Sequence, residues 1–402
     1  MHDQVETPAY VYDLAEVRAN HANLREALPE RTGLYYSLKA NPHPLLLREL
    51  RTLGARAEAC SPGELDAALA AGWPAAEVLY TGPGKRTGDL ARALRLGVRE
   101  FSADSVTGLD QLDAAAAAAG VTVRCLLRIN DDQPAAGQGL TMTGVASQFG
   151  ADSSWVLERP EQFTGRDHVE LAGLHLYMGT NLDTVEALAA QFRRSLRTAV
   201  RLTEVLRADL RVLDLGGGFG APFAKAGKAF ELAGLKAELA RMFDEEVPGW
   251  RTGTPEIVFE SGRYLVGTAG TLLTTVLDVK RSHGKDVVVL DSGINHLGGM
   301  SGLRRLPPLV PHLLSERDGA LDAMVTGPLC TPLDLWARSA PLPRVRPGDV
   351  LAVPNVGAYG LYASLVAFLG HPLPMEVVVD GDDPDSPPHQ SRLQLARLTA
   401  KE

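Results

Sequence analysis

Side chains that can do chemistry stand at the ends of short apolar runs in this sequence. Together they offer an amine, two carboxylates, a guanidinium, an imidazole, an aromatic ring and a glycine run that exposes backbone N–H groups. Such a combination suits covalent and acid–base chemistry beside a bound anion. The residues are Lys39, Glu58, Arg128, His175, Tyr177, Gly216, Gly217, Gly218 and Glu260.

Lys39 closes the largely apolar run YYSL. Burying an ammonium without a partner is costly, and burial or nearby cations lower the pKa of a lysine. A neutral amine at this position could form a Schiff base with an aldehyde. A lysine that has simply reached solvent at the end of a strand is the alternative, and the run by itself leaves both interpretations open.

Two motifs could bind an anion, LGGGFG (215–220) and ESGRY (260–264). Glycines let the backbone turn tightly and bring N–H groups close to a phosphate, although an ordinary strand-to-helix turn explains the first motif about as well. In the second motif, Glu260 offers an acceptor for a protonated ring nitrogen. Gly262 and Arg263 offer a further phosphate contact, and the alternative is a surface Glu/Arg pair.

Cys330 ends the motif GPLC (327–330), which is followed by Asp334 and then by NVGAYG (355–360). A thiol, with a pKa of about 8.5, can be tuned toward neutrality and could donate a proton. A small buried hydrophobe is the equally open alternative, since most free cysteines are of that kind. The three cysteines lie far apart and form no CxxC, so neither a disulfide framework nor a metal site is predicted.

Short β-rich runs alternate with helical patterns between residues 33 and 260. Helix ends are marked by Ser61 with Pro62 and Glu64, by Ser105, and by glycines at 72, 97 and 120. Eight strands in this length predict an α/β fold, a (β/α)8 barrel over residues 29–261, because that fold needs about 250 residues. A doubly wound open sheet is the structural alternative. The runs are 34–38, 55–59, 77–81, 98–102, 122–129, 170–177, 211–215 and 256–260.

Helical periodicity becomes scarce after Gly262. Apolar runs separated by Gly, Pro and Asp, such as GTLLTTVLDV, DVVVLDS, DAMVTG, DVLAVP and MEVVVD, predict a second, mainly β domain. We assign residues 1–28 and 262–402 to this β-sandwich-like domain, because YVYD (10–13) precedes the first barrel strand and could pair with it. In a barrel, functional groups collect at the C-terminal ends of the strands, where the side chains named above stand.

The chain has 402 residues and a formal charge of −9, from 40 basic and 49 acidic side chains. That length suits two domains with real cores, and the absence of a basic run argues against nucleic acid or an anionic membrane as the partner. The acidic N-terminus does not look like a signal peptide. Residues 350–375 carry no formal charge, but several prolines and glycines there disfavour a membrane helix, so we expect a cytoplasmic protein.

Taken in order, these motifs resemble the fold-type III pyridoxal-phosphate decarboxylases, the group of ornithine, arginine and diaminopimelate decarboxylases. The resemblance runs from about Thr7 to Val379, nearly the whole chain. Several ordered matches are stronger evidence than any one of them. The motifs are YYSLKAN, AEACSPGEL, LLRIN, TGVASQFG, GLHLYMGTN, LDLGGGFG, FESGRY, GPLC and GAYG.

The resemblance implies a role for each candidate. Lys39 would bind the aldehyde of pyridoxal 5'-phosphate, and Glu260 would pair with its ring nitrogen, keeping the ring able to accept electrons. Cys330 would be a catalytic residue that arrives from the second subunit of a homodimer with shared active sites. The phosphate would be held by Gly216, Gly217, Gly218, Gly262, Arg263 and Tyr359, and the ring would lie near Glu58, Arg128, His175 and Tyr177.

Two departures from the family pattern bear on chemistry and substrate. The family's ring-stacking histidine is replaced by Tyr177, which keeps an aromatic face without a titrating group, while His175 is expected on the other side of the strand or toward the barrel mouth. The acidic residue that follows the cysteine and binds a distal ammonium is replaced by Thr331. Losing that carboxylate removes the charge-assisted bond to a cationic substrate tail.

The variant motifs most resemble the carrier-protein-dependent decarboxylases of butirosin and vicenistatin biosynthesis. That resemblance implies α-decarboxylation of an acidic amino acid, of the glutamate or 3-methylaspartate type, held by its side-chain carboxyl on an acyl carrier protein. Thr331, Asp334 and Arg305 are the substrate-binding candidates, although a solvated basic turn is the alternative for Arg304 and Arg305. Local basic residues, Arg344 and Arg346 among them, could meet the acidic carrier.

Three other functions stay open at this stage. The first is decarboxylation of a free amino acid such as diaminopimelate or ornithine, which Thr331 disfavours. The second is racemisation on the same barrel, which Glu260 disfavours because alanine racemases place an arginine at the ring nitrogen. The third is a non-catalytic carrier of the cofactor, which the β domain and GPLC disfavour.

Overall fold

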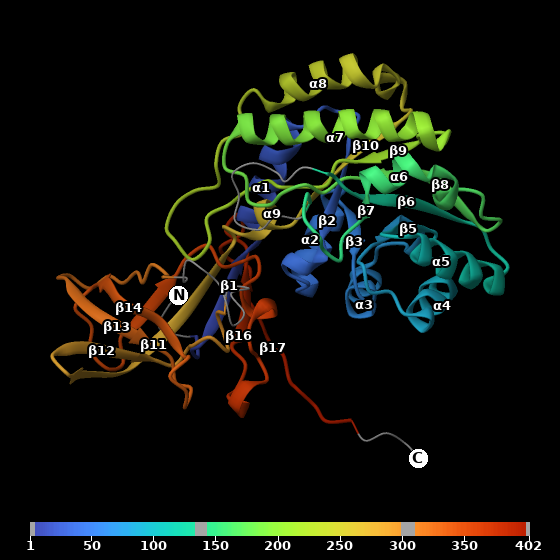
Figure 1. The fold of residues 1–402 in the computed structure, drawn as a ribbon. Helices are drawn as coiled ribbons and strands as arrows, with labels where there is room; N and C mark the ends of the chain where they lie inside the picture. Colours follow the sequence, from blue (N-terminus) through green and yellow to red (C-terminus); the bar gives the residue numbers. More distant parts are fainter. Residues whose placement is uncertain (1–4, 133–142, 299–309, 399–402) are drawn as a thin grey trace. The chain divides into compact units, whose positions relative to one another are not determined.

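The computed structural model describes residues 5–132, 143–298 and 310–398, and the chain folds into two compact units (Figure 1). The first unit contains residues 1–17, 221–229 and 266–402, and the second contains residues 18–220 and 230–265. Among the described residues, no helix has the length and hydropathy needed to span a membrane. The predictions for Arg304 and Arg305 fall outside the described residues.

The second unit is a closed barrel of eight parallel strands, as the sequence predicts. The strands follow the order β5-β4-β3-β2-β10-β9-β8-β6, and pairing of β5 with β6 closes the ring, which excludes the open sheet. The two-residue strand β7 (Ala151–Asp152) adds to β6. The barrel strands are β2 (Gly33–Ser37), β3 (Arg56–Ala59), β4 (Val78–Tyr80), β5 (Glu100–Ala103), β6 (Val123–Asn130), β8 (Val169–His175), β9 (Val212–Asp214) and β10 (Glu256–Ser261).

Side chains from β2, β4, β6, β8 and β10 fill the barrel interior. Tyr35, Leu79, Leu126, Ala172 and Val258 form one buried cluster, each at most 6% exposed. A filled interior leaves no pore, so polar side chains can gather only where the strands end. This packing explains why the reactive residues of the sequence stand at the last positions of their strands.

Helices follow the barrel strands, and their predicted ends are confirmed. Ser61 accepts a hydrogen bond from Glu64 N, Ser105 accepts one from Gly108 N, and Gly72 ends its helix with φ 99°. The helices are α1 (Leu14–Ala27), α2 (Pro44–Thr52), α3 (Pro62–Ala71), α4 (Thr87–Leu96), α5 (Val106–Ala119), α6 (Ser153–Glu158), α7 (Val185–Leu206), α8 (Leu235–Glu246) and α9 (Arg263–Val266). Single turns of 3₁₀ helix include η2 (Leu38–Ala40), directly after β2.

The first unit is mainly β, also as predicted. Its strands run in the order β14-β13-β12-β11-β1-β16-β17, and β15 pairs with β11. The segment YVYD lies in β1, which pairs antiparallel with β11 and parallel with β16. The strands are β1 (Ala9–Asp13), β11 (Gly270–Ser282), β12 (Lys285–Leu290), β13 (Leu321–Thr326), β14 (Leu335–Leu342), β15 (Val350–Val353), β16 (Met375–Val379) and β17 (His389–Arg392).

The boundaries of the compact units differ from the sequence-based domain limits in three places, the shortest being residues 262–265, which belong with the barrel. Most of α1 belongs with the barrel, because Arg18 bonds Glu49 and Asn20 donates to Leu265 O. Residues 221–229 interrupt the barrel and join the β unit, where Asn355 Nδ2 donates to two of their carbonyl groups at 2.7 and 2.9 Å. Neither contact leaves a periodic signal in the sequence.

Candidate active site

Lys39 lies in η2, the turn that follows β2, and it forms an ion pair with Glu58 from the end of β3. Its Nζ is 3.0 Å from Glu58 Oε2 and 3.3 Å from Oε1. The sequence led us to expect burial and neighbouring cations around this lysine. Instead the side chain is 38% exposed and pairs with the Glu58 carboxylate, which is 2% exposed, because the turn carries Lys39 beyond the filled core.

The Glu58 carboxylate is held in its charged form. Burial by itself would raise the pKa of Glu58, but the Lys39 ammonium and a hydrogen bond from the Thr81 hydroxyl outweigh it, so the pKa falls below its usual value. Lys39 and Glu58 therefore work as one charged pair at the ends of neighbouring parallel strands. Such a pair keeps the amine in place beside the other polar groups of the barrel.

The three glycines after β9 form a turn that no other residue could form. Gly216 and Gly218 have φ values of 64° and 110°, in the left-handed region. A Cβ on Gly216 would lie 2.6 Å from Tyr177 Cδ2, and one on Gly217 would collide with the carbonyl oxygen of Glu260. Among the described residues, the N–H groups of Gly217 and Gly218 meet no acceptor, as an anion-binding turn requires.

Glu260, at the end of β10, is buried beside two other titratable side chains. Its Oε1 is 3.3 Å from His175 Nε2, and neither atom makes a hydrogen bond with a described residue. Asp214, on β9, lies in the same group, in which one ligand atom from each residue falls within 4.8 Å of the others. A buried carboxylate oxygen without a donor is costly, so this group calls for a further polar partner.

Burial governs the charges of this group. Burial, with the nearby Glu58 and Asp214 charges, raises the pKa of Glu260 well above its usual value, and burial raises the pKa of Asp214 to about 7. Burial also lowers the pKa of His175 well below its usual value, helped by the cations of Arg128, Lys39 and Lys85. The imidazole is therefore neutral at physiological pH, and the acids need a cationic or proton-donating partner to stay ionised.

Arg128, on β6, is held between two aromatic rings. Its guanidinium carbon lies 4.6 Å from the Phe149 ring centroid and 5.9 Å from the Tyr177 ring centroid. Asp104 Oδ1 lies 4.0 Å from its Nε. Tyr177 thus lies near a cation and also beside Gly216. The aromatic face predicted at this position is present beside the glycine turn.

The motif ESGRY brings Gly262 and Arg263 next to the lysine segment. A Cβ on Gly262 would lie 2.7 Å from Ala40 Cβ and 3.2 Å from Ser37 O, so only glycine allows α9 to begin this close to η2. Arg263 is the first residue of α9 and is half-buried. The structure therefore gathers the lysine, both carboxylates, the glycine turn and the ESGRY motif in the barrel unit.

The remaining candidates belong to the β unit. Cys330 is exposed, which removes the buried-hydrophobe alternative. Thr331 is half-buried, and its hydroxyl accepts a hydrogen bond from Leu333 N at 3.3 Å. Tyr359 is half-buried with a left-handed φ of 56°. Arg305 lies outside the described residues, so its predicted contact with substrate stays a prediction.

Asp334 has a structural function in the β unit that the sequence did not reveal. It is 3% exposed, its Oδ1 accepts from Ile294 N at 2.9 Å, and its Oδ2 accepts from Leu329 N at 2.8 Å. A Cβ on Gly293 or Gly327 would collide with the carboxylate. Because both oxygens accept hydrogen bonds from backbone N–H groups, Asp334 ties the GPLC turn to a neighbouring loop. Its predicted contact with substrate stays a prediction.

Sequence reasoning missed several residues of the barrel site. Asp214 stands two positions before the glycine turn, in LDLGGG, and its place at a strand end was the signal that could have revealed it. Ser102 is the last residue but one of β5, and its hydroxyl lies 3.1 Å from His175 Nδ1. Phe149 lies in an irregular segment, and no pattern in the sequence points to its contact with Arg128.

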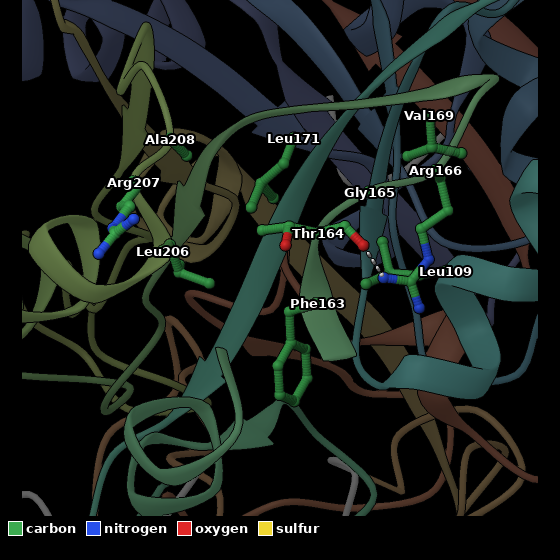
Figure 2. A pocket seen from close by; sticks show the side chains of 10 residues that line it. All are labelled: Leu109, Phe163, Thr164, Gly165, Arg166, Val169, Leu171, Leu206, Arg207 and Ala208. Atoms are coloured by element: carbon green, nitrogen blue, oxygen red, sulfur yellow. Dashed lines mark hydrogen bonds between the residues drawn. The ribbon is translucent and has the colours of Figure 1, made fainter. Parts of the chain in front are cut away.

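A separate cavity of about 400 Å³ lies at the other end of the barrel (Figure 2). Phe163, Arg166 and Leu206 line it beside Val169, the first residue of β8, and Arg166 donates to Thr164 O at 3.0 Å. His175 is the last residue of the same strand. The cavity therefore lies at the opposite strand end from the polar cluster and takes no part in it.

Comparison with known proteins agrees with the geometry. A family described as "Pyridoxal-dependent decarboxylase, pyridoxal binding domain" matches residues 14–267. The chain is 31% identical over 380 residues to the L-glutamyl-[BtrI acyl-carrier protein] decarboxylase of Niallia circulans, covering 93% of this chain and 89% of the relative. It is also 31% identical over 390 residues to the diaminopimelate decarboxylase of Methanothermobacter thermautotrophicus, covering 94% and 87%.

Solved structures share the architecture. A variant of diaminopimelate decarboxylase from Helicobacter pylori, complexed with L-lysine, superposes with a TM-score of 0.84 at 26% identity, covering 97% of this chain and 94% of that chain. A variant of the protein named SrLDC, in complex with PLP, gives a TM-score of 0.79 at 25% identity, covering 95% and 94%. The likeness extends over both units.

Proposed function

Because the chain belongs to the family of pyridoxal-dependent decarboxylases, we propose that its substrate is an acidic amino acid tethered to an acyl carrier protein. The enzyme is a decarboxylase that uses pyridoxal phosphate. The finer proposal is that it removes the α-carboxylate of a glutamate- or 3-methylaspartate-type residue whose side-chain carboxyl is held as a thioester. The product stays on the carrier as an amino acyl group.

The barrel residues suit the cofactor. A phosphate fits the glycine turn, where Gly217 and Gly218 offer N–H groups without acceptors among the described residues. A protonated ring nitrogen fits Glu260, whose buried Oε1 lacks a hydrogen-bond donor. When bound, the cofactor supplies an aldehyde that condenses with an amine and a ring that accepts the electron pair left when the bond to the carboxylate breaks.

The chain's own residues perform the remaining tasks. Lys39 offers the amine for the covalent link, and Glu58 holds it there through the ion pair. Glu260 keeps a proton at the ring nitrogen. The low dielectric of the buried site strengthens the attraction between the carboxylate and the protonated ring. Tyr177 offers an aromatic face beside the glycine turn, with the Arg128 guanidinium carbon 5.9 Å from its ring centroid.

The observation that carries the choice of substrate is the lack of a free carboxylate after Cys330. Thr331 takes the place of the acid that binds a distal ammonium in the decarboxylases of free diamino acids. Asp334, the nearest acid along the chain, has both oxygens engaged by backbone N–H groups. A neutral thioester arm needs no such carboxylate, and one relative of equal identity acts on a carrier-bound glutamyl group.

The alternative is a decarboxylase of a free amino acid such as diaminopimelate or ornithine. It is favoured by the number of relatives named diaminopimelate decarboxylase, at 28–32% identity. We give Thr331 more weight than the number of such relatives, because sequence identity over the whole chain reflects mostly the barrel that all these enzymes share. The two substrates differ in the charge of the tail, and the residue at position 331 is the one expected to contact that tail.

We further propose a cytoplasmic homodimer in which Cys330 reaches the active site of the second subunit. Its exposure suits a residue that acts across a subunit boundary. In that setting its thiol, or a water beside it, would return a proton to the substrate's α-carbon after carbon dioxide leaves. Arg344 and Arg346 are exposed basic residues that could meet the acidic surface of a carrier.

Replacing Thr331 tests the proposed substrate. In Thr331→Asp, the ratio of kcat/KM for free diaminopimelate to that for a glutamyl carrier protein should rise by roughly 10- to 100-fold. A new charge-assisted bond of about 1.5–3 kcal/mol would favour the cationic tail. Steady-state kinetics with both substrates measure the ratio, and Thr331→Ser, which keeps the hydroxyl, is the matched control. A wild-type enzyme that prefers free diaminopimelate would contradict the proposal.

Replacing Cys330 tests its proton role. Cys330→Ala should lower kcat by roughly 10²-fold, in the range of a lost acid–base group, while pyridoxal phosphate remains bound with unchanged absorbance. Turnover assays and titration of the cofactor separate the two effects. Cys60→Ala, which changes the half-buried cysteine of the barrel unit, is the comparison. Unchanged turnover and product in Cys330→Ala would exclude the role.

A further inference from the structure

Gln191 contacts the glycine turn that follows β9, and the reaction described so far does not use it. The carbonyl groups of Gly216 and Gly218 accept hydrogen bonds from backbone N–H groups, at 2.9 and 2.8 Å. The carbonyl group of Gly217 accepts one from Gln191 Nε2, which lies on α7 and is 2.9 Å away. Among the described residues, Gln191 is the one side chain that holds a carbonyl group of this turn.

This hydrogen bond fixes the direction of a whole peptide unit. The C=O group of Gly217 and the N–H group of Gly218 belong to one planar peptide, which is trans. The two groups of a trans peptide point in opposite directions. Because the carbonyl group points at the amide of Gln191, the N–H group of Gly218 points away from that amide, and it meets no acceptor among the described residues.

The turn alone does not hold this peptide in place. Glycine on both sides removes most of the steric limits on rotation of the peptide, and Gly218 already has a φ of 110°, which other residues rarely adopt. Rotation would carry the N–H group of Gly218 away from an anion bound at the turn and would break the bond to Gln191. That bond therefore stabilises one of the orientations that two glycines allow.

Gln191 is well placed to act as this support. It is 7% exposed, and its helix packs against the turn, since the ring centroids of Phe192 and Phe219 lie 5.7 Å apart. Its Oε1 is buried and has no donor among the described residues, a cost that an apolar side chain of similar size would avoid. An amide turned the other way would put two acceptor oxygens together. The bond made by Nε2 therefore explains the amide better than core packing does.

We propose that Gln191 is a positioning residue that directs the N–H group of Gly218 at the phosphate of the cofactor. Asp214 supports the same turn from its first residue, since its Oδ1 accepts from Gly216 N at 2.8 Å. With that N–H group engaged and the three carbonyl groups held, the N–H groups of Gly217 and Gly218 are left for an anion. This inference rests on the place of the phosphate in the proposed function.

The test compares two forms of the cofactor that differ only in the phosphate. Pyridoxal phosphate and pyridoxal are titrated separately into the full-length enzyme after its cofactor has been removed. The ratio of the dissociation constants, pyridoxal over pyridoxal phosphate, reports the contribution of the phosphate. Pyridoxal closes to an internal hemiacetal, but that equilibrium is the same in every titration and cancels between variants. A structural loss elsewhere in the site weakens both forms alike and leaves the ratio unchanged.

Gln191→Met keeps the size of the side chain and removes the donor. We expect the ratio to fall roughly tenfold, as for the weakening of one hydrogen bond to a charged group. Gln191→Asn keeps an amide that is one methylene too short to reach Gly217 O. It should lower the ratio similarly, and it serves if Gln191→Met does not fold.

The matched control lies on the same helix. Ser195 is a fully buried polar residue one turn further along α7, and its hydroxyl makes no hydrogen bond with a described residue. Ser195→Ala therefore changes a buried polar group of α7 without touching the glycine turn, and it should keep the wild-type ratio.

Gly218→Ala separates the two levels of the proposal, because a side chain there is strained at a φ of 110° and would lie 3.0 Å from Gln191 Nε2. If it lowers the ratio while Gln191→Met and Gln191→Asn keep the wild-type value, the role of Gln191 is overturned and the place of the phosphate stands. If Gly218→Ala also keeps the ratio, the phosphate does not bind this turn and both proposals fail. A fall in both Gln191 variants, with Ser195→Ala unchanged, supports the inference, whereas an equal fall in Ser195→Ala would overturn it.

Discussion

Lys39→Ala should abolish the covalent link to pyridoxal phosphate and lower kcat by at least about 10³-fold, because the variant lacks the amine to which the proposed function assigns that link. The absorbance of the lysine-bound cofactor should disappear, and borohydride should no longer fix the cofactor to the protein. Absorbance spectroscopy before and after reduction measures the first effect, and turnover with a loaded carrier protein measures the second.

The alanine variant also leaves the buried Glu58 carboxylate without its ammonium, so a second variant is needed. Lys39→Arg keeps a cation opposite Glu58 but cannot form a Schiff base. If activity is lost because the amine is missing and not because the protein unfolds, both variants lack the reducible cofactor and both are inactive. Lys39→Arg should then keep the thermal stability of the wild type. A reducible cofactor that persists in either variant would assign the link to another lysine.

Glu260→Gln should lower kcat by roughly 10²–10³-fold while the cofactor remains covalently bound. A neutral amide cannot keep the ring nitrogen protonated, so the ring loses much of its ability to accept electrons. The expected fall in kcat is comparable to the fall caused by removing one preorganised group that stabilises a developing charge. The absorbance of the bound cofactor should change with the ring's protonation, and single-turnover kinetics should show that the slow step is chemical.

The control lies on the same strand. Glu256 begins β10, at the opposite end from Glu260, and pairs with Arg56 near the surface. Glu256→Gln should leave kcat and the cofactor absorbance unchanged. Equal activity in Glu260→Gln and Glu256→Gln would mean that the buried carboxylate is not the partner of the ring nitrogen.

The barrel could be predicted from sequence because its signals are local. Each strand is a short apolar run, and helix ends are marked by residues such as Ser61 and Gly72, whose side-chain or backbone preferences act within a few positions. Lys39, Glu58 and Glu260 were found because a filled barrel puts polar residues at the strand ends. The family resemblance then connected those ends to a cofactor.

What the sequence could not predict depends on contacts between distant positions. Asp334 carries the same charge whether it binds substrate or two backbone N–H groups, and only folding reveals that Ile294 and Leu329 use both oxygens. His175 was expected near the ring, on the other side of the strand from Tyr177 or toward the barrel mouth, but spacing along the chain could not show that it lies within 3.3 Å of Glu260 on another strand. The carboxylate partner of Lys39 is likewise a contact between strands.

The most direct test of the central claim is intact-protein mass spectrometry of a glutamyl-loaded acyl carrier protein after incubation with the enzyme and pyridoxal phosphate. We predict that the loaded arm loses the mass of one carbon dioxide, and that this loss is absent with Lys39→Ala. Free glutamate and free diaminopimelate, incubated in parallel, should release carbon dioxide far more slowly. An unchanged arm for both glutamyl and 3-methylaspartyl carriers, with rapid decarboxylation of free diaminopimelate, would contradict the account.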